Sequence, residues 1–432
     1  MGDWKTLLQE VESGVYDKVL TQVYAPGGAE EELKKARERA VHVVREFGEN
    51  YPDNTNEALL FSGPGRTEIG GNHTDHQHGH VLCGSVNMDI LACAAPNGTS
   101  VIRMISEGHT SVEISLEDLS VREDEINTSP ALVRGVAVGI QERGYEVGGY
   151  DAYLVSDVLS GSGLSSSAAY EVLIGNIIGH FFTQDALSAE EIAKIGQFAE
   201  NKYFGKPCGL MDQMGSSIGG AVAIDFKDPA APVFKKADYD FAESGHALCI
   251  IDTGSSHDDL TGDYAAIPQE MGAVAACFGK QFLREVPEED FYSALAEVRE
   301  KRGDRAVLRA MHFYADDRMA QEEAAALEAK DFDRFLALVN ASGVSSSTQL
   351  QNVSTLTDPA QQAVPVAIGL AKKLLNGTGA VRVHGGGFAG TIQAFVPEEK
   401  LDEFKKGIEA VFGEGRCHVL RIRPQGGFIL LP

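Results

Sequence analysis

A run of apolar and small residues, 164–182, follows directly on a short loop of glycines and serines. The run predicts a helix that is buried along its length, because a helix without a polar face must be covered by other elements. Hydrophobic residues make up 43% and charged residues 23% of the 432 positions, a balance typical of globular proteins with two or three domains. A disordered or fibrous chain is therefore excluded.

The loop at the start of this helix is a candidate anion site. Residues 160–169 read SGSGLSSSAA. Free backbone N–H groups and the positive end of a helix dipole attract phosphate at such a position, and the hydroxyls can bind Mg²⁺ or phosphate oxygens. No lysine follows the glycines, so the loop is not a Walker A motif. A linker or a simple N-cap is the alternative, but a linker would not run straight into an apolar helix.

A second glycine-rich segment, residues 63–79, reads GPGRTEIGGNHTDHQHG. Small residues let the backbone approach a ligand closely. Arg66, His73 and Asp75 supply a cation, a titratable group and an acceptor, which together suit a polyhydroxylated ligand. Histidines also stand at 73, 76, 78 and 80, so a metal cluster or purely structural histidines are alternatives. Their spacing is common by chance, and the HExxH signature is absent from the sequence.

Two further features carry weaker signals. Residues 384–390, HGGGFAG, lie between two apolar strands and fit either a ligand loop or a plain hairpin turn. Asp212 stands among small and apolar residues in KPCGLMDQMGSS, residues 206–217. A carboxylate in such company is a candidate for a buried functional site, although a lone aspartate is more often a helix cap.

The pattern of expected elements predicts an α+β chain in two halves. We expect an N-terminal extension (1–28), an N-terminal domain (29–225) and a C-terminal domain (226–432). Helices are expected at 29–48, 188–203, within most of 263–375 and at 399–412. Strands are expected at 58–62, 80–86, 88–94, 100–106, 110–115, 221–226, 246–252, 417–422, 427–431 and on both sides of the 384–390 loop.

Charge and cysteine content restrict the partners and the compartment. Asp and Glu total 63 against 37 Lys and Arg, a net charge of −26, which disfavours nucleic acid and anionic membranes as partners. An anionic substrate then has to be held by local donors. The six cysteines are widely spaced without a CxxC pair, and neither a signal peptide nor a long apolar run is present. We therefore expect a cytoplasmic protein with reduced thiols.

Taken together, four ordered motifs resemble the GHMP small-molecule kinases and, among them, the galactokinase family. The family patterns PGRxNxIGEHxDYxxG, PxxxGLxSSA, GxxxGMDQ and GGGFGG correspond here to PGRTEIGGNHTDHQHG, SDVLSGSGLSSSAA, KPCGLMDQMGSS and GGGFAG. The resemblance covers most of the chain. It implies a two-domain α+β fold with the active site between the N-terminal and C-terminal domains. The implied reaction is phosphoryl transfer from ATP to the anomeric hydroxyl of a galactose-like sugar, in a monomer or weak homo-oligomer.

The resemblance also assigns roles to residues. Asp212 corresponds to the catalytic aspartate, as a base or as an orienting group, and Arg66 to the partner that keeps it ionised. Glu200 lies where the family has its acidic Mg²⁺ ligand, with Ser167 as the second ligand. The ATP phosphates are assigned to Gly161, Ser162, Gly163, Leu164, Ser165, Ser166 and Ser167. The sugar is assigned to Asn72, His73, Asp75 and Tyr264.

Departures from the family pattern include Glu68 in place of Asn, Asn72 in place of Glu, His76 in place of Tyr and Ala389 in place of Gly. The family's Glu, which corresponds to Asn72 here, is expected near C6 of the sugar. Its carboxylate would repel a substrate that carries a carboxylate at C6. Asn72 removes that repulsion, so a galacturonate kinase is an alternative. Plant galacturonate kinases likewise lack this Glu and have an Asp-His-Gln run, as at 75–77. A non-catalytic sugar sensor is a further alternative, although the retained Ser166–Ala169 stretch, Asp212 and Arg66 favour catalysis.

Overall fold

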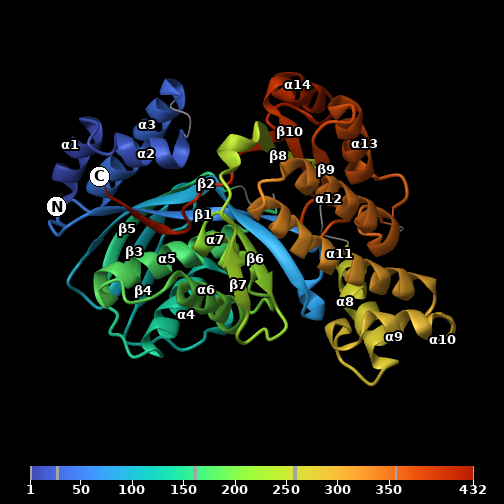
Figure 1. Ribbon diagram of the computed structural model, residues 1–432. Helices are drawn as coiled ribbons and strands as arrows, with labels where there is room; N and C mark the ends of the chain where they lie inside the picture. Colours follow the sequence, from blue (N-terminus) through green and yellow to red (C-terminus); the bar gives the residue numbers. More distant parts are fainter. Residues whose placement is uncertain (1, 26–28, 159–162, 256–259, 356–357, 432) are drawn as a thin grey trace.

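The computed structural model describes residues 2–25, 29–158, 163–255, 260–355 and 358–431. Two bodies, each built on a β-sheet with helices against it, lie side by side (Figure 1). The first half of the chain forms most of the larger body, and the helix-rich second half forms the smaller one. None of the described helices combines the length and apolarity that a bilayer span requires.

The larger sheet has eight strands in the order β12-β1-β2-β5-β3-β4, with β6 paired to β2 and β7 to β6. Strand β2 is long enough to serve two neighbours, because residues 90–96 pair with β5 and residues 80–84 with β6. The two separate strands expected at 80–86 and 88–94 are thus one strand. The bounds are β1 Leu59–Gly70, β2 His80–Pro96, β3 Val101–Ser106, β4 Val112–Ser115, β5 Tyr150–Ser156, β6 Ala221–Asp225, β7 Val233–Lys236 and β12 Phe428–Leu430.

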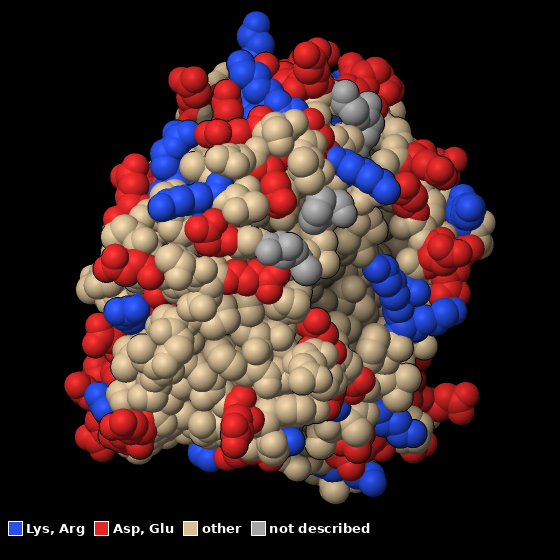
Figure 2. Space-filling model, turned by 90° about the vertical axis from the view of Figure 1, so that its left-hand side faces the viewer, with Lys and Arg blue, Asp and Glu red and all other residues tan. Residues whose placement is uncertain are grey.

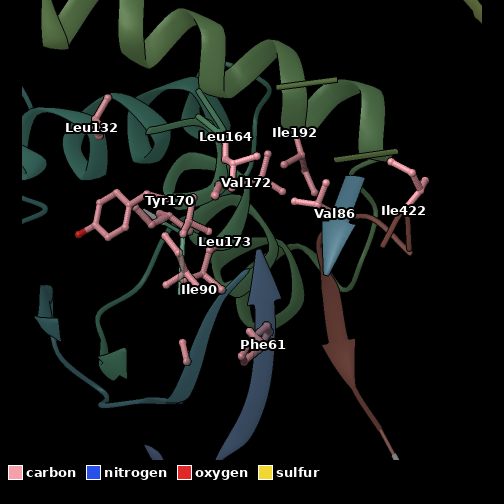
Figure 3. Close-up of a cluster of buried hydrophobic side chains, with 14 of the residues drawn as sticks. Phe61, Val86, Ile90, Leu132, Leu164, Tyr170, Val172, Leu173, Ile192 and Ile422 are labelled. Atoms are coloured by element: carbon pink, nitrogen blue, oxygen red, sulfur yellow. The ribbon is translucent and has the colours of Figure 1, made fainter. Parts of the chain in front are cut away.

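Alternation along the strands builds two cores on opposite faces of this sheet. Leu59 and Phe61 of β1 face the cluster that contains Val172, Leu173 and Ile192, as the close-up in Figure 3 illustrates. Leu60 faces the other cluster. The first cluster receives helices α4 (Ser129–Gln141), α5 (Ser166–Thr183) and α6 (Ala189–Ala199), and the second receives α1 (Trp4–Glu12), α2 (Asp17–Tyr24) and α3 (Glu30–Asn50). The buried helix expected at 164–182 is confirmed as α5.

The smaller sheet has the order β11-β8-β10-β9. Helices α13 and α14 pack on one face of this sheet, and α12 packs on the other. The hydrophobic side chains between α12 and the sheet belong to the same core cluster as those of the larger body. Strands are β8 His246–Asp252, β9 Ala380–Val383, β10 Thr391–Pro397 and β11 Cys417–Leu420. Helices are α7 Met211–Ile218, α8 Thr261–Ala276, α9 Glu288–Ser293, α10 Leu295–Arg302, α11 Asp304–Glu328, α12 Phe332–Ser345, α13 Ala363–Leu375 and α14 Leu401–Phe412.

Sheet membership crosses the expected domain division at residue 225 in two places. Strand β7 extends the larger sheet, and β12, near the C-terminus, pairs antiparallel with β1. In the segment expected as an N-terminal extension, Leu7, Val11, Leu20 and Val23 of α1 and α2 are buried against the larger body. Helices α1 and α2 and strand β12 therefore contribute to the core of the larger body. The domain division itself stays a prediction.

Figure 2 shows acidic side chains spread over one face of the molecule, with fewer Lys and Arg among them. This distribution agrees with the net charge of −26. Cations that bind an anionic ligand must therefore be concentrated locally.

Candidate active site

Arg66 and Asp212 form an ion pair between two segments that lie far apart in sequence. Arg66 comes from β1, and Asp212 stands in the first turn of α7. Nε of Arg66 donates to Oδ1 of Asp212 at 2.7 Å, and a terminal guanidinium nitrogen lies 2.6 Å from the same oxygen. A carboxylate in the first turn also faces the positive end of its helix dipole. The pair predicted from the family resemblance is in contact.

The neighbours of Asp212 keep it ionised. Burial raises the pKa of its carboxyl group, but the Arg66 guanidinium, a hydrogen bond from Ser165 and the Lys206 ammonium outweigh burial and hold the pKa below its usual range. Arg66 stays charged, because Asp212 more than offsets the effect of burial on the guanidinium pKa. The site thus presents one anionic oxygen acceptor beside one fixed cation.

The Gly/Ser loop approaches this pair through its backbone. Arg66 donates to the carbonyl of Gly163 through Nη1, and its backbone N–H donates to the carbonyl of Leu164 at 2.9 Å. Gly163 has φ +75°, and Ser165, at the start of α5, has φ +56°. Positive φ at a non-glycine residue is uncommon and clusters at functional sites. Gly161 and Ser162 lie outside the described residues.

Ser167 and Glu200 lie together beside the loop. The Ser167 hydroxyl donates to Oε1 of Glu200 at 3.2 Å, and the Glu200 side chain is only 1% exposed. Glu200 opens a short π-helix, Glu200–Phe204, a form that often occurs at functional sites. A hydroxyl and a carboxylate oxygen are hard donors of the kind that Mg²⁺ prefers, and Mg²⁺ usually takes its other ligands from water and phosphates. The two residues predicted as metal ligands therefore fit that ion.

The second and third glycine-rich segments dock onto each other. His73 has φ +61° and donates through Nε2 to the carbonyl of Gly386 at 3.0 Å. Burial lowers the pKa of His73 to about 3, so the ring is neutral at physiological pH. Because Nε2 carries the proton, Nδ1 is a buried acceptor, and among the described residues it has no partner. The 384–390 loop is thus a hairpin turn between β9 and β10 whose carbonyls also hold the second segment.

Asn72 lies behind this surface. Its side chain is fully buried, and Nδ2 donates to Glu68 Oε1 at 2.9 Å and to the Gly385 carbonyl at 2.8 Å. Its Oδ1 accepts from Asn352 at 2.7 Å and from Ser346 at 3.3 Å. Every hydrogen-bonding position of the amide is occupied by protein. The side chain therefore has no free donor or acceptor in this structure, and a contact of Asn72 with the sugar near C6 stays a prediction.

The four histidines of the second segment have different surroundings. His73 and His76 stack with ring centroids 5.4 Å apart, and Tyr264 lies edge-on to His73 at 5.1 Å. His78 stacks on Phe282, and His80 lies 3.0 Å from Asp317. No group of three or more His, Cys, Asp or Glu residues suited to a metal ion is found in the part of the chain that the structure describes. Asp75 accepts from the backbone of His76, and its Oδ2 lies near Gly209, in the segment that leads to Asp212.

A cavity of about 680 Å³ lies apart from these residues. Its lining comes from α2, from the smaller sheet and from residues 419–425, and it contains none of the predicted site residues. Neither Arg66 nor Asp212 lines this cavity.

Comparison with known proteins agrees with this arrangement. Residues 131–220 match the GHMP kinases N terminal domain, and residues 45–96 match the galactokinase galactose-binding signature. The galactokinase of Glaesserella parasuis serovar 5 (strain SH0165) is 33% identical over 355 residues, which are 79% of this chain and 86% of that protein. The galactokinase of Streptomyces coelicolor (strain ATCC BAA-471 / A3(2) / M145) is 29% identical over 368 residues, 84% of this chain and 91% of the relative. The chain belongs to the galactokinase family.

Solved structures of this family and of other GHMP kinases share the fold. Lactococcus lactis galactokinase complexed with galactose superposes with a TM-score of 0.73 at 23% identity, over 89% of this chain and 99% of that one. Methanococcus jannaschii mevalonate kinase gives 0.61 at 15% identity, over 85% and 98%. The predicted α+β GHMP fold is confirmed, and as a galactokinase-family member the chain is an ATP-dependent sugar kinase.

In this galactokinase-family chain, three residues that sequence reasoning did not single out support the site. Gln213 Nε2 donates to Glu200 at 2.8 Å and to Glu171 at 3.0 Å, so one amide joins two buried carboxyl groups. Burial and the neighbouring Glu200 raise the pKa of Glu171 well above its usual range. Lys206 Nζ lies 3.3 Å from Glu200 Oε1. Gln213 and Lys206 stand inside the motif quoted for Asp212, but adjacency in sequence did not reveal their targets.

Proposed function

We propose that the protein phosphorylates the anomeric hydroxyl of galactose with ATP, which gives galactose 1-phosphate and ADP. The observation that carries this proposal is the Arg66–Asp212 pair, which joins the second glycine-rich segment to the first turn of α7 and contacts Gly163, just before α5. Relatives named galactokinase that align with most of the chain support galactose as the acceptor.

The reacting groups follow from the geometry. The anomeric oxygen attacks the γ-phosphorus, the bond to the β–γ bridging oxygen breaks, and ADP leaves. Asp212, held ionised by Arg66, accepts the hydrogen bond of the attacking hydroxyl and can take its proton. Arg66 places a positive charge next to the transferred group, where negative charge is concentrated. A loose transition state needs positioning more than a strong base, so orientation by Asp212 is the larger part of its role.

We propose that Ser167 and Glu200 hold Mg²⁺ and that residues 161–167 cradle the ATP phosphates. When bound there, the ion would reduce the negative charge of the phosphates. The start of α5 adds backbone N–H donors and the helix dipole. The hard oxygen donors and the 3.2 Å separation of the Ser167 and Glu200 oxygens support the assignment.

For the sugar, we propose direct hydrogen bonds between its hydroxyls and His73, Asp75 and Tyr264. Nδ1 of His73, which has no partner among the described residues, is an acceptor for a hydroxyl. Asn72 has a supporting role, because its amide ties the second segment to Gly385 and Asn352. Galacturonate stays the alternative acceptor, since the argument for it is the missing carboxylate at position 72 and not a hydrogen bond from Asn72. A cytoplasmic location, a monomeric or weakly oligomeric state and the absence of nucleic-acid or membrane partners stay predictions.

The test is ATP-dependent ADP release with Mg²⁺, measured for galactose, galacturonate, N-acetylgalactosamine and glucose in parallel. We expect the highest kcat/KM for galactose. A preference for galacturonate would replace galactose by the uronate as the substrate. Binding of galactose without ADP release would point to the sensor alternative and contradict the proposal.

A further inference from the structure

Glu200 is contacted on both of its carboxylate oxygens, and the two contacts differ. Oε2 accepts from Gln213 at 2.8 Å, inside the protein. Oε1 accepts from Ser167 at 3.2 Å and lies 3.3 Å from Lys206 Nζ. Oε1 is thus the oxygen next to the other proposed metal ligand. The Lys206 ammonium occupies the position at which a cation would meet this oxygen.

Lys206 is held at this place by its backbone. Its N–H donates to the Glu200 carbonyl at 3.2 Å, and the preceding Gly205, with φ +83°, turns the chain back after the π-helix. The side chain is 60% exposed, whereas that of Glu200 is 1% exposed. A mobile, hydrated ammonium therefore caps a fixed and buried carboxylate. Such a cap can leave when a stronger cation arrives, while Glu200 stays in place.

The surrounding charge explains why a cation is needed before any metal binds. Glu200 and Asp212 both act electrostatically on Glu171, and Lys206 acts on all three carboxyl groups. Arg66 is committed to Asp212 and the Gly163 carbonyl. Lys206 is thus the cation that compensates Glu200, because a buried carboxylate without one is strongly disfavoured.

We propose that Lys206 is a resident substitute for the metal ion: it neutralises Glu200 in the empty enzyme, and the metal that arrives with ATP displaces it. The inference rests on the proposed Ser167–Glu200 metal site and adds a competitor to it. Metal binding then exchanges one cation for another, which lowers the net affinity for the metal. Lys206 is a positioning residue in this scheme, since it acts on Glu200 and not on the substrate.

The test measures metal-dependent nucleotide binding and not turnover. The dissociation constants of adenylyl imidodiphosphate with Mn²⁺ and of the same nucleotide with EDTA are measured by calorimetry, without sugar. For Lys206→Met and Lys206→Gln we expect binding with Mn²⁺ to tighten about threefold to fivefold, as for a half-exposed ion pair, and binding with EDTA to stay constant. Lys206→Arg should behave like wild type, because it keeps the charge.

Lys202→Met is the matched control. Lys202 lies on the π-helix that begins at Glu200, and its ammonium lies 5.0 Å from the centroid of the Phe198 ring. Removing this ammonium should therefore change neither dissociation constant. Unchanged Mn²⁺ affinity in Lys206→Met would overturn the proposal. Weaker nucleotide binding with and without metal would also overturn it, by making Lys206 a phosphate contact. The proposal would also be overturned if the wild-type protein bound the nucleotide equally well with Mn²⁺ and with EDTA. Sugar-dependent ADP release is measured separately, so failure of the sugar-kinase assignment is distinguishable.

Discussion

Asn72 and Glu68 hydrogen-bond to each other at 2.9 Å, with the amide donating to the carboxylate. The galactokinase-family pattern has Asn and Glu at these two positions in the opposite order. The chain thus keeps one carboxylate and one amide while exchanging their places. Glu68 is anchored by Arg382 at 2.8 Å, and burial raises its pKa to about 7 in spite of that cation. Both side chains are buried.

This relationship predicts strong coupling between positions 68 and 72. Asn72→Glu places a second buried carboxylate against the first and removes a donor to Gly385, so we expect a loss of about 3–5 kcal/mol in the free energy of unfolding. The double variant Glu68→Asn/Asn72→Glu restores one carboxylate and one amide and should recover at least about 1 kcal/mol relative to the sum of the single variants. Urea unfolding of the four proteins measures the coupling. If the losses in unfolding free energy of the two single variants simply add in the double variant, positions 68 and 72 are not coupled, which would contradict this prediction.

Asp212→Asn should keep the fold and lose activity. The amide cannot take the proton and does not attract Arg66 as an anion, so we expect kcat to fall by about 10²–10⁴. ADP release with galactose measures kcat, and calorimetry should show nucleotide affinity within about threefold of wild type. Asp185→Asn, on an exposed turn next to His180, is the control and should leave kcat unchanged. Near-normal turnover of folded Asp212→Asn would remove Asp212 from the mechanism.

Gly163→Ala should impair ATP binding beyond the cost of its backbone conformation. A Cβ at Gly163 would lie 2.9 Å from Nδ1 of His384, and the residue has φ +75°. Gly108 has φ +76° and open space around it, so Gly108→Ala measures the conformational cost alone, about 1–2 kcal/mol. We expect a raised KM for ATP only in Gly163→Ala. Equal behaviour of the two variants would show that the close approach to His384 has no functional weight.

Acid should destabilise the protein partly through His384. Burial lowers its pKa to about 3, and Nε2 and Nδ1 lie 3.1 and 3.0 Å from the Thr67 and Thr391 hydroxyls. The unfolded chain binds this proton near pH 6.5 and the folded protein only near pH 3. Stability from the neutral ring is therefore full above pH 6.5 and falls as the pH decreases. Between pH 7 and pH 5 the loss is about 2 kcal/mol for one such group. His384→Gln should reduce the difference between the unfolding free energies at these two pH values by about that amount. An unchanged difference would mean that the folded state does hold the proton.

Sequence determined much of the site because its signals are local. The Gly/Ser loop and the apolar run after it predicted α5, and four motifs in order predicted the family and the pairing of Arg66 with Asp212. The remaining contacts depend on packing between distant segments, which no local pattern encodes. The expected C-terminal strand at 427–431 formed as β12, but only the tertiary structure shows it on β1 of the larger sheet.

Residue identity at positions 72 and 206 was plain in the sequence, and their surroundings were not. The family pattern placed Asn72 near the sugar, whereas the folded chain closes Gly385, Asn352 and Glu68 around its amide. Nothing in the sequence distinguished Lys206 from other lysines. In the folded chain, the turn at Gly205 brings its ammonium to Glu200. The sequence by itself determined which chemistry the chain carries. The tertiary structure decided which of those groups are already hydrogen-bonded by the protein, because hydrogen-bond partners and burial are set by residues that meet only on folding.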